Sequence, residues 1–240
     1  MGFYRGPNIV TDGLELVVDI ASERSYPGSG TTTTCIVSGK TFTPDVNSPT
    51  FVTSGIAHMD MEKDNPDNLK STSSYSGINT QNAYTRIGWF NIESSDGNFK
   101  PIIGNTIGNN IDMSLAISSY KLHFHQYSNS TSGGTSGGDY GTSGTAQIPA
   151  NTWVQGAIVV NRSAQTLKFY INGVLDKSTS IPVIGSSSSS YVLIGGPDSD
   201  SYSGARYFDG KIARVSHYNK ELTAAEIAQD YNALKSRFGL

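Results

Sequence analysis

The sequence contains one cysteine among its 240 residues, Cys35. A single cysteine excludes an internal disulfide bond and a thiolate metal cage within the chain. No apolar run approaches the ~20 residues that a membrane-spanning helix requires. The opening residues MGFYRGPNIVTDG also lack the apolar core of a signal peptide. We therefore expect a protein that is made in the cytoplasm and does not insert into a membrane.

Charged residues are scarce as well. Lys, Arg, Asp and Glu together make up 15% of the chain, and the net charge is −3. Binding to nucleic acid depends on clustered Lys and Arg that neutralise phosphates, and the sequence has no such cluster. A nucleophile elbow, a Walker loop and a zinc motif are also absent from the sequence. These absences exclude nucleic acid as the main partner and leave few routes to catalysis.

Glycine, serine, threonine and asparagine are abundant, as expected for many short strands joined by turns. Asn172-Gly173 between two alternating runs indicates a β-hairpin, because both residues accept a positive φ. The only helical pattern lies near the end, where Thr223 and Glu226 fit a capping box. Many strands and one terminal helix predict an antiparallel β-sandwich. The clearest strand patterns are Leu14–Ile20, Ala83–Ile92, Asn151–Asn161 and Thr166–Asp176.

Domain boundaries are few. Ser128–Thr145 consists mostly of Ser, Gly and Thr. Because strand patterns continue on both sides, we interpret it as a long loop within one domain. We expect an N-terminal arm over residues 1–12 and a single domain over residues 13–240. The arm is too short to build a core of its own, so it either packs on its own sandwich or, as we favour, anchors the chain to a neighbouring protein. Its apolar side chains are Phe3, Tyr4, Ile9 and Val10.

The segment NTWVQGAIVVNRSAQTLKFYINGVLD resembles the centre of laminin-G-like domains. Trp153, Tyr170, Asn172 and Gly173 stand at the positions of that family's Trp strand and of its aromatic-Asn-Gly hairpin. YVLIGG and FDGKIARVSHYNKELTAAEI resemble the family's closing strands and helix, and YTRIGWFNI its aromatic strand. Arg86 departs from the pattern, because an apolar residue is usual there. The resemblance implies a concanavalin A-like jelly roll with a short C-terminal helix.

The opening GPNIVTDGLELVVDIASERSYPGSGTT is similar to a variety of this domain found in bacteriophage virion proteins, particularly those of marine phages. This resemblance implies a non-enzymatic structural protein on the virion surface. Such a protein decorates the capsid or belongs to a fibre or tail, and it is made in the host cytoplasm. Its expected partners are other virion proteins and further copies of itself.

AHMDMEKDN places His58, Asp60, Glu62 and Asp64 on one face if the segment is extended. Glucanases of the same superfamily present a row of carboxylates on a strand, with two carboxyl groups close enough for retaining hydrolysis. Here the order of residue types is reversed, and the turn-forming sequence NPDN follows at once. We therefore interpret the stretch as the solvated end of a strand, with a glycoside hydrolase as the weaker alternative.

Calcium is a further alternative, because it binds carboxylate, amide and carbonyl oxygens. Laminin-G-like relatives often bind it at a rim of the sandwich. Asp60, Asp64 and Asp67 form one candidate cluster, and Asp198 and Asp200 form another. The competing interpretation is that both clusters are polar loops.

His123 and His125 share a strand face and suggest a transition-metal site. A third ligand is not apparent in the sequence. We therefore expect them to be exposed strand residues.

Carbohydrate binding remains open as an alternative function, that of an adhesin or lectin module that contacts a host glycan. Sugar sites combine aromatic faces with amide and carboxylate groups on loops that a rigid scaffold holds. Two loops meet this description, and loops of the same composition also contact proteins. The candidate ligand residues are Tyr127, Asp139, Tyr140, Asp198, Asp200, Tyr202 and Arg206.

Overall fold

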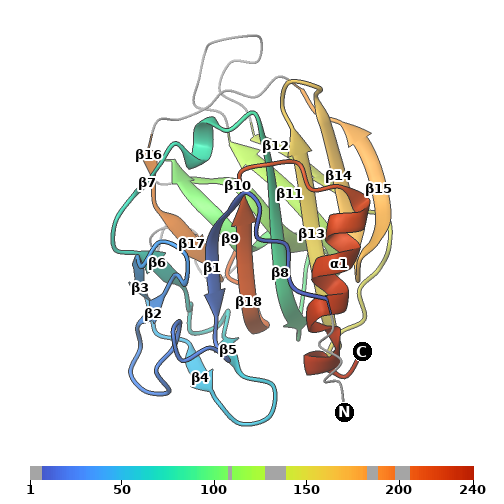
Figure 1. The fold of residues 1–240 in the computed structure, drawn as a ribbon. Helices are drawn as coiled ribbons and strands as arrows, with labels where there is room; N and C mark the ends of the chain where they lie inside the picture. Colours follow the sequence, from blue (N-terminus) through green and yellow to red (C-terminus); the bar gives the residue numbers. More distant parts are fainter. Residues whose placement is uncertain (1–6, 108–109, 128–138, 183–188, 198–205) are drawn as a thin grey trace.

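The computed structural model describes residues 7–107, 110–127, 139–182, 189–197 and 206–240. These residues form a sandwich of two antiparallel β-sheets with one short α-helix near the C-terminal end (Figure 1). The predicted all-β jelly roll with a terminal helix is confirmed. In the described ranges, no helix is both long and apolar enough to cross a membrane.

The first sheet has the strand order β15-β14-β13-β8-β18-β5-β4, and β1 also pairs with β18. Strand β15 therefore forms one edge of this sheet. The strands are β1 (Leu14–Asp19), β4 (Thr50–Val52), β5 (His58–Met61), β8 (Ala83–Ile92), β13 (Trp153–Asn161), β14 (Thr166–Ile171), β15 (Val174–Ser180) and β18 (Gly210–Tyr218).

The second sheet has the order β12-β11-β10-β9-β17-β6-β3-β2. A separate two-stranded ribbon joins β7 (Tyr75–Ser76) to β16 (Ser189–Ser190), and a 3-10 turn, η1, spans Ile78–Thr80. The strands of the second sheet are β2 (Thr33–Thr34), β3 (Thr41–Pro44), β6 (Leu69–Ser71), β9 (Lys100–Ile107), β10 (Asn110–Ser118), β11 (Lys121–Tyr127), β12 (Asp139–Ser143) and β17 (Val192–Ile194).

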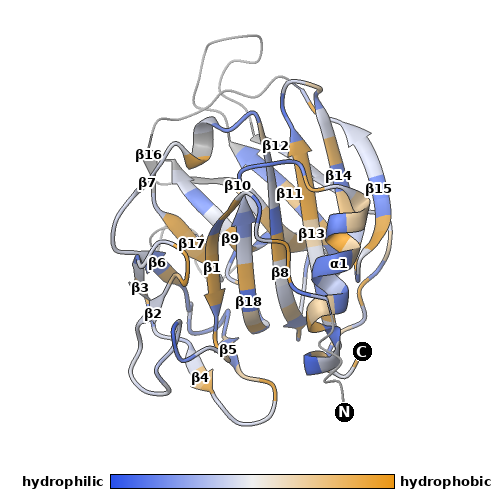
Figure 2. Cartoon of the chain, viewed as in Figure 1, coloured by the Kyte–Doolittle hydropathy of each residue, from blue (hydrophilic) through white to orange (hydrophobic). Residues whose placement is uncertain are grey.

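The main core lies between the two sheets. Alternate residues of each strand point inward, because successive side chains in a strand face opposite ways. Phe90 of β8, Leu115 of β10 and Phe124 of β11 are among its fully buried members. Figure 2 shows apolar residues running along the central strands and polar residues gathered in the connections.

Helix α1 (Ala224–Leu234), followed by the 3-10 turn η3 (Lys235–Phe238), covers the outer face of the first sheet (Figure 1). The predicted capping box is confirmed, since the Thr223 and Glu226 side chains each bond the other's backbone amide. Trp89 on the outer face of β8 stacks on Phe238, with ring centroids 4.0 Å apart. A second apolar layer, outside the sandwich core, therefore fixes the helix.

The described chain begins beside this helix. The side-chain amide of Gln229 donates to the carbonyl oxygen of Asn8 at 2.9 Å, and the hydroxyl of Tyr218 donates to the carbonyl of Val10 at 3.0 Å. Val10 is buried against Ile227 and its neighbours. Val10 therefore belongs to the chain's own apolar layer, Ile9 is half-buried, and the other two apolar arm residues, Phe3 and Tyr4, lie outside the described residues.

The local turn chemistry explains two hairpins. Asn172 and Gly173 have φ values of 49° and 79°, as a tight two-residue turn between β14 and β15 requires. Ser119 and Tyr120 have φ values of 50° and 58° and join β10 to β11 in the same way. One expectation was wrong, because the predicted loop through Thr145 contains strand β12.

Candidate functional site

The carboxylate stretch after His58 does not form a catalytic row. Strand β5 ends at Met61, and its two methionines are buried in the core. Glu62 is exposed in the turn that follows, and the side chain of Asp64 is 91% exposed. The interpretation as a polar strand end is thus supported, and the alternating carboxylate face of a glucanase is not formed.

Asp67 differs from its neighbours because it is buried, with 2% of its surface exposed. Its Oδ2 accepts a hydrogen bond from the amide of Glu62 at 3.1 Å. Burial, followed by the nearby charges of Glu62 and Asp60, raises the pKa of the Asp67 carboxyl to about 6. Within the described ranges, no three histidine, cysteine or carboxylate side chains are arranged to hold a metal ion. The structure therefore does not bring Asp60, Asp64 and Asp67 together as a calcium site.

The two predicted ligand loops are described only at their ends. Tyr127 and Asp139 pair across β11 and β12, at the end of that hairpin. Tyr140 is half-buried, and its hydroxyl donates to the carbonyl of Ser180 in β15 at 3.3 Å. Tyr140 thus links the edges of the two sheets. The candidates Asp198, Asp200 and Tyr202 lie outside the described residues.

Arg206, the remaining candidate, lies over a ring on the outer face of the second sheet. Its guanidinium carbon is 4.6 Å from the centre of the Phe99 ring. Phe99 stacks on His125 at 3.9 Å, and His123 lies beside the pair. Phe99 and His125 are buried, and burial lowers the pKa of His123 to about 4. The expectation of exposed histidines was wrong for His125, which is buried beside Phe99.

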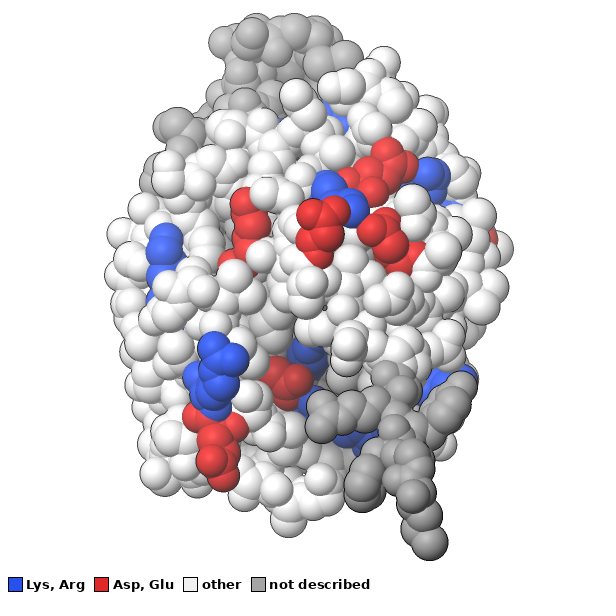
Figure 3. Space-filling view, viewed as in Figure 1, with Lys and Arg blue, Asp and Glu red and all other residues white. Residues whose placement is uncertain are grey.

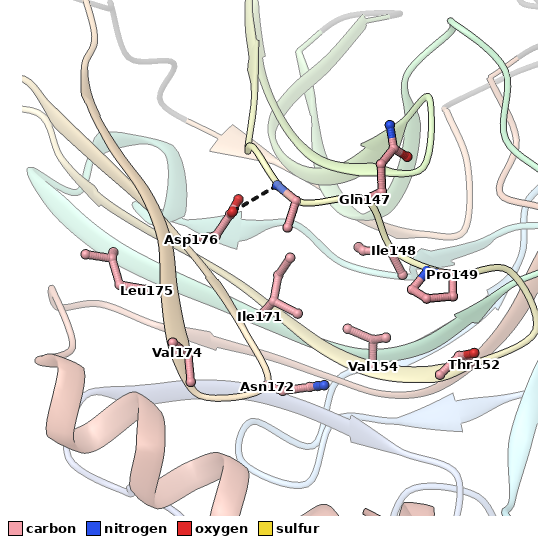
Figure 4. A pocket seen from close by; sticks show the side chains of 11 residues that line it. Gln147, Ile148, Pro149, Thr152, Val154, Ile171, Asn172, Val174, Leu175 and Asp176 are labelled. Carbon is pink, nitrogen blue, oxygen red and sulfur yellow. Dashed lines mark hydrogen bonds between the residues drawn. The ribbon is translucent and has the colours of Figure 1, made fainter.

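An apolar pocket opens at the edge of the sandwich where β13, β14 and β15 meet the connection between β12 and β13 (Figure 4). Its volume is about 380 Å³, which falls in the range of small-ligand pockets. Ile148, Val154 and Ile171 line it from three different segments. The lining residues in the described ranges are Ala146, Gln147, Ile148, Pro149, Thr152, Val154, Ile171, Asn172, Val174, Leu175 and Asp176.

The rim of this pocket carries two large apolar side chains that are exposed to solvent. Val174 and Leu175 begin the edge strand β15, and they are 69% and 50% exposed. We call these two residues the β15 rim. Figure 2 shows that β15 is apolar at its start and polar further on. Asn172 builds the adjoining turn and holds it to β13, since its Oδ1 accepts from the amide of Gln155 at 2.9 Å.

The described lining of the pocket is mostly uncharged. Among the described lining residues Asp176 alone is charged, and its carboxylate accepts hydrogen bonds from the amides of Thr145 at 2.7 Å and Ala146 at 2.9 Å. None of the lining residues that the structure describes is aromatic, although sugar sites usually present an aromatic ring. The aliphatic walls suit an apolar side chain. Sequence reasoning missed this site, and the available signal was the Val-Leu pair directly after the hairpin turn, which interrupts the alternation expected of a strand.

Charges elsewhere are mostly paired. Lys220 contacts Asp12 at 2.6 Å and Glu226 at 2.8 Å, and Lys168 contacts Glu221 at 2.7 Å. On the face seen in Figure 3, basic and acidic side chains lie beside one another in small groups. This face offers no continuous basic surface for a polyanion.

The fold defines a class, the laminin-G-type β-sandwich, and the sequence comparison agrees with it. The family model of the concanavalin A-like lectin/glucanases superfamily matches residues 64–228. Since the match covers more than half of the chain, the protein belongs to this superfamily. No curated protein sequence matches the chain.

Solved structures show the same fold at low sequence identity. The binding domain of botulinum neurotoxin DC in complex with rat synaptotagmin II is 16% identical, with a TM-score of 0.63 over 92% of this chain and 52% of that one. The botulinum neurotoxin serotype D/C VPI 5993 binding domain is 15% identical, with a TM-score of 0.68 over 92% and 52%. The chain thus spans about half the length of these toxin domains.

A third structure matches over nearly its whole length. Domain 4 of AbnA, an extracellular arabinanase of Geobacillus stearothermophilus, was solved in complex with arabinotriose. It is 15% identical, with a TM-score of 0.58 over 91% of this chain and 98% of that one. Solved structures with this fold therefore include one determined in complex with a protein and one determined in complex with arabinotriose.

Proposed function

We propose that the protein is a non-enzymatic binding module that docks a protein partner through the apolar pocket and the β15 rim. One observation carries the proposal: a cavity of about 380 Å³ with aliphatic walls lies beside two exposed apolar side chains on an edge strand. Burying one large apolar side chain contributes ~1.5–3 kcal/mol. The edge of β15 additionally offers backbone groups for an added strand.

The setting that we propose is the surface of a bacteriophage virion, as a capsid decoration protein or a component of a fibre or tail. The support is the resemblance of the opening segment, residues 6–32, to virion proteins with this domain. Partners in that setting are other virion proteins and copies of the same chain.

A matched pair of variants tests the docking surface. The double variant Val174→Glu/Leu175→Glu places two charges on the β15 rim. The control, Val37→Glu, places one charge at another exposed apolar residue, which is 48% exposed. Quantitative mass spectrometry of purified virions should find the control at the wild-type copy number and the rim variant depleted. Equal incorporation of all three proteins rejects the docking surface.

A second candidate function is binding of a host glycan, favoured by the likeness to the domain solved with arabinotriose. The residues that we assign to it are Tyr127, Asp139 and Tyr140 at the end of the β11–β12 hairpin. A glycan array with the wild type and a Tyr127→Ala variant tests this function. Glycan binding that the substitution abolishes supports a lectin site. If the wild type binds no glycan on the array, this second function is rejected.

A further inference from the structure

We propose that the apolar pocket of one copy receives the segment Phe3-Tyr4-Arg5 of a second copy. The inference rests on the proposed docking function and names the partner. It joins two features: a pocket with aliphatic walls and an aromatic stretch of the sequence that precedes the described residues.

The residues that follow the Phe3-Tyr4-Arg5 segment are fixed on the domain, and they set the place where the segment joins it. Asn8 is held to α1 through Gln229, and Val10 is buried on the outer face of the first sheet. The described chain therefore begins, at residue 7, on the α1 side of the sandwich (Figure 1). Six residues reach at most ~20 Å when fully extended.

The pocket opens on the other side of the β14–β15 turn. Ile148 and Val154 belong to the core between the sheets, and Ile171 packs against that core. The turn itself touches α1, because a Cβ placed on Gly173 would lie 3.1 Å from the Cβ of Tyr231. Figure 4 shows α1 on one side of this turn and the pocket side chains on the other. A segment that starts beside α1 is thus better placed for a neighbouring copy than for its own pocket.

The chemistry of the two parts is complementary. Phe3 and Tyr4 supply the aromatic side chains that the aliphatic walls lack, and burial of one such ring is the main source of affinity. Arg5 is the only charged side chain among the first seven residues, and Asp176 is the charged residue among those described that line the pocket. In an extended conformation the segment also matches the edge of β15, which pairs only with β14 in the described part of the chain.

Two variants distinguish the copy that provides the segment from the copy that provides the pocket. The first lacks residues 1–6 and keeps the pocket. The second, Ala146→Trp, fills the pocket from an exposed lining position and keeps the segment. In sedimentation velocity, the wild type should self-associate, each variant alone should be monomeric, and an equimolar mixture should form a 1:1 heterodimer. A monomeric wild type overturns the proposal, as does a truncated protein that associates like the wild type.

A peptide titration tests the contact directly and does not depend on assembly. A synthetic Met1–Asn8 peptide should bind the truncated protein at one site and fail to bind the protein that also carries Ala146→Trp. An Arg5→Glu peptide should bind about fivefold more weakly. Absence of peptide binding, or binding unaffected by Ala146→Trp, overturns the inference. If the peptide fails but the Val174→Glu/Leu175→Glu protein is still lost from virions, the docking surface stands and its occupant is another protein.

Discussion

The Nε of Arg86 donates a hydrogen bond to Nδ1 of His217 at 3.2 Å, between the two sheets, and both side chains are fully buried. The same guanidinium also donates to the carbonyl of Met113 and to the side chain of Asn105. Nε2 of His217 is 2.9 Å from Oε1 of Gln81. Burial, and then the charge of Arg86, hold the pKa of His217 well below its usual value. The neutral ring thus accepts from Arg86 and donates to Gln81.

This contact gives the first prediction. Replacing Arg86 with methionine keeps an unbranched side chain but leaves the buried acceptors around the guanidinium without their donor. Arg86→Met should lower the free energy of unfolding by about 2 kcal/mol or more. The measurement is urea unfolding followed by circular dichroism. Arg24→Met, at an exposed position, is the control and should change stability by less than about 0.5 kcal/mol. Equal midpoints for both variants would contradict the account.

The buried carboxyl of Asp67 gives a pH-dependent prediction. Because its pKa in the folded protein is about 6, above the ordinary value, the folded state binds a proton more tightly than the unfolded state. Its contribution to stability is therefore greatest below about pH 4 and is lost as the pH rises through 6. At pH 7 the folded protein must hold this buried carboxyl largely ionised, which lowers its stability. Asp67→Asn removes the buried charge, so the variant should be more stable than the wild type at pH 7 by on the order of 1 kcal/mol.

Urea unfolding of this variant between pH 4 and pH 8 provides the test. The gain should disappear near pH 4, where the wild-type carboxyl is protonated. Asp64→Asn, whose native side chain is 91% exposed, is the control and should show no such trend. A gain of the same size at every pH would mean that the carboxyl is not the cause.

The β14–β15 turn supports the pocket rim, and it predicts a sensitive glycine. Gly173 has φ +79°, and a Cβ there would meet Tyr231 and Ala228 of α1 at 3.1–3.3 Å. Gly173→Val should destabilise the fold by at least ~1 kcal/mol, since a β-branched residue is strained at positive φ. Gly39 has φ +71° and open space around it, so Gly39→Val isolates the strain from the contact. If Gly173→Val lowers the free energy of unfolding no more than Gly39→Val does, the close packing of the turn against α1 adds nothing to the effect of the backbone strain.

The strand end after β5 predicts an absence of glycoside hydrolysis. Strand β5 stops before Glu62, so the carboxylate pair that retaining hydrolysis needs is not held on one strand. Wild type and Glu62→Gln should both stay at background when reducing-sugar release is measured on β-glucans. Turnover by the wild type that the substitution removes would establish an enzyme.

Much of the fold was predictable because it depends on local rules. Asn172-Gly173 fixes a turn through its own backbone preference, and Thr223 with Glu226 caps a helix within four residues. The buried place of Arg86 was not predictable, because its partners come from strands far apart in the sequence. The pocket was missed for the same reason. The Val174-Leu175 pair breaks the strand alternation, but only the topology shows that β15 lies at an edge beside Ile148 and its neighbours.

The central claim is that a protein partner occupies the apolar pocket and covers the β15 rim. A cryo-EM map of the purified virion at side-chain resolution tests it most directly. We predict that the domain is found on the particle surface, with density from a neighbouring chain seated between Ile148 and Ile171 and lying over Val174 and Leu175. A map in which this edge faces solvent, or in which the domain is absent from the particle, would contradict the account.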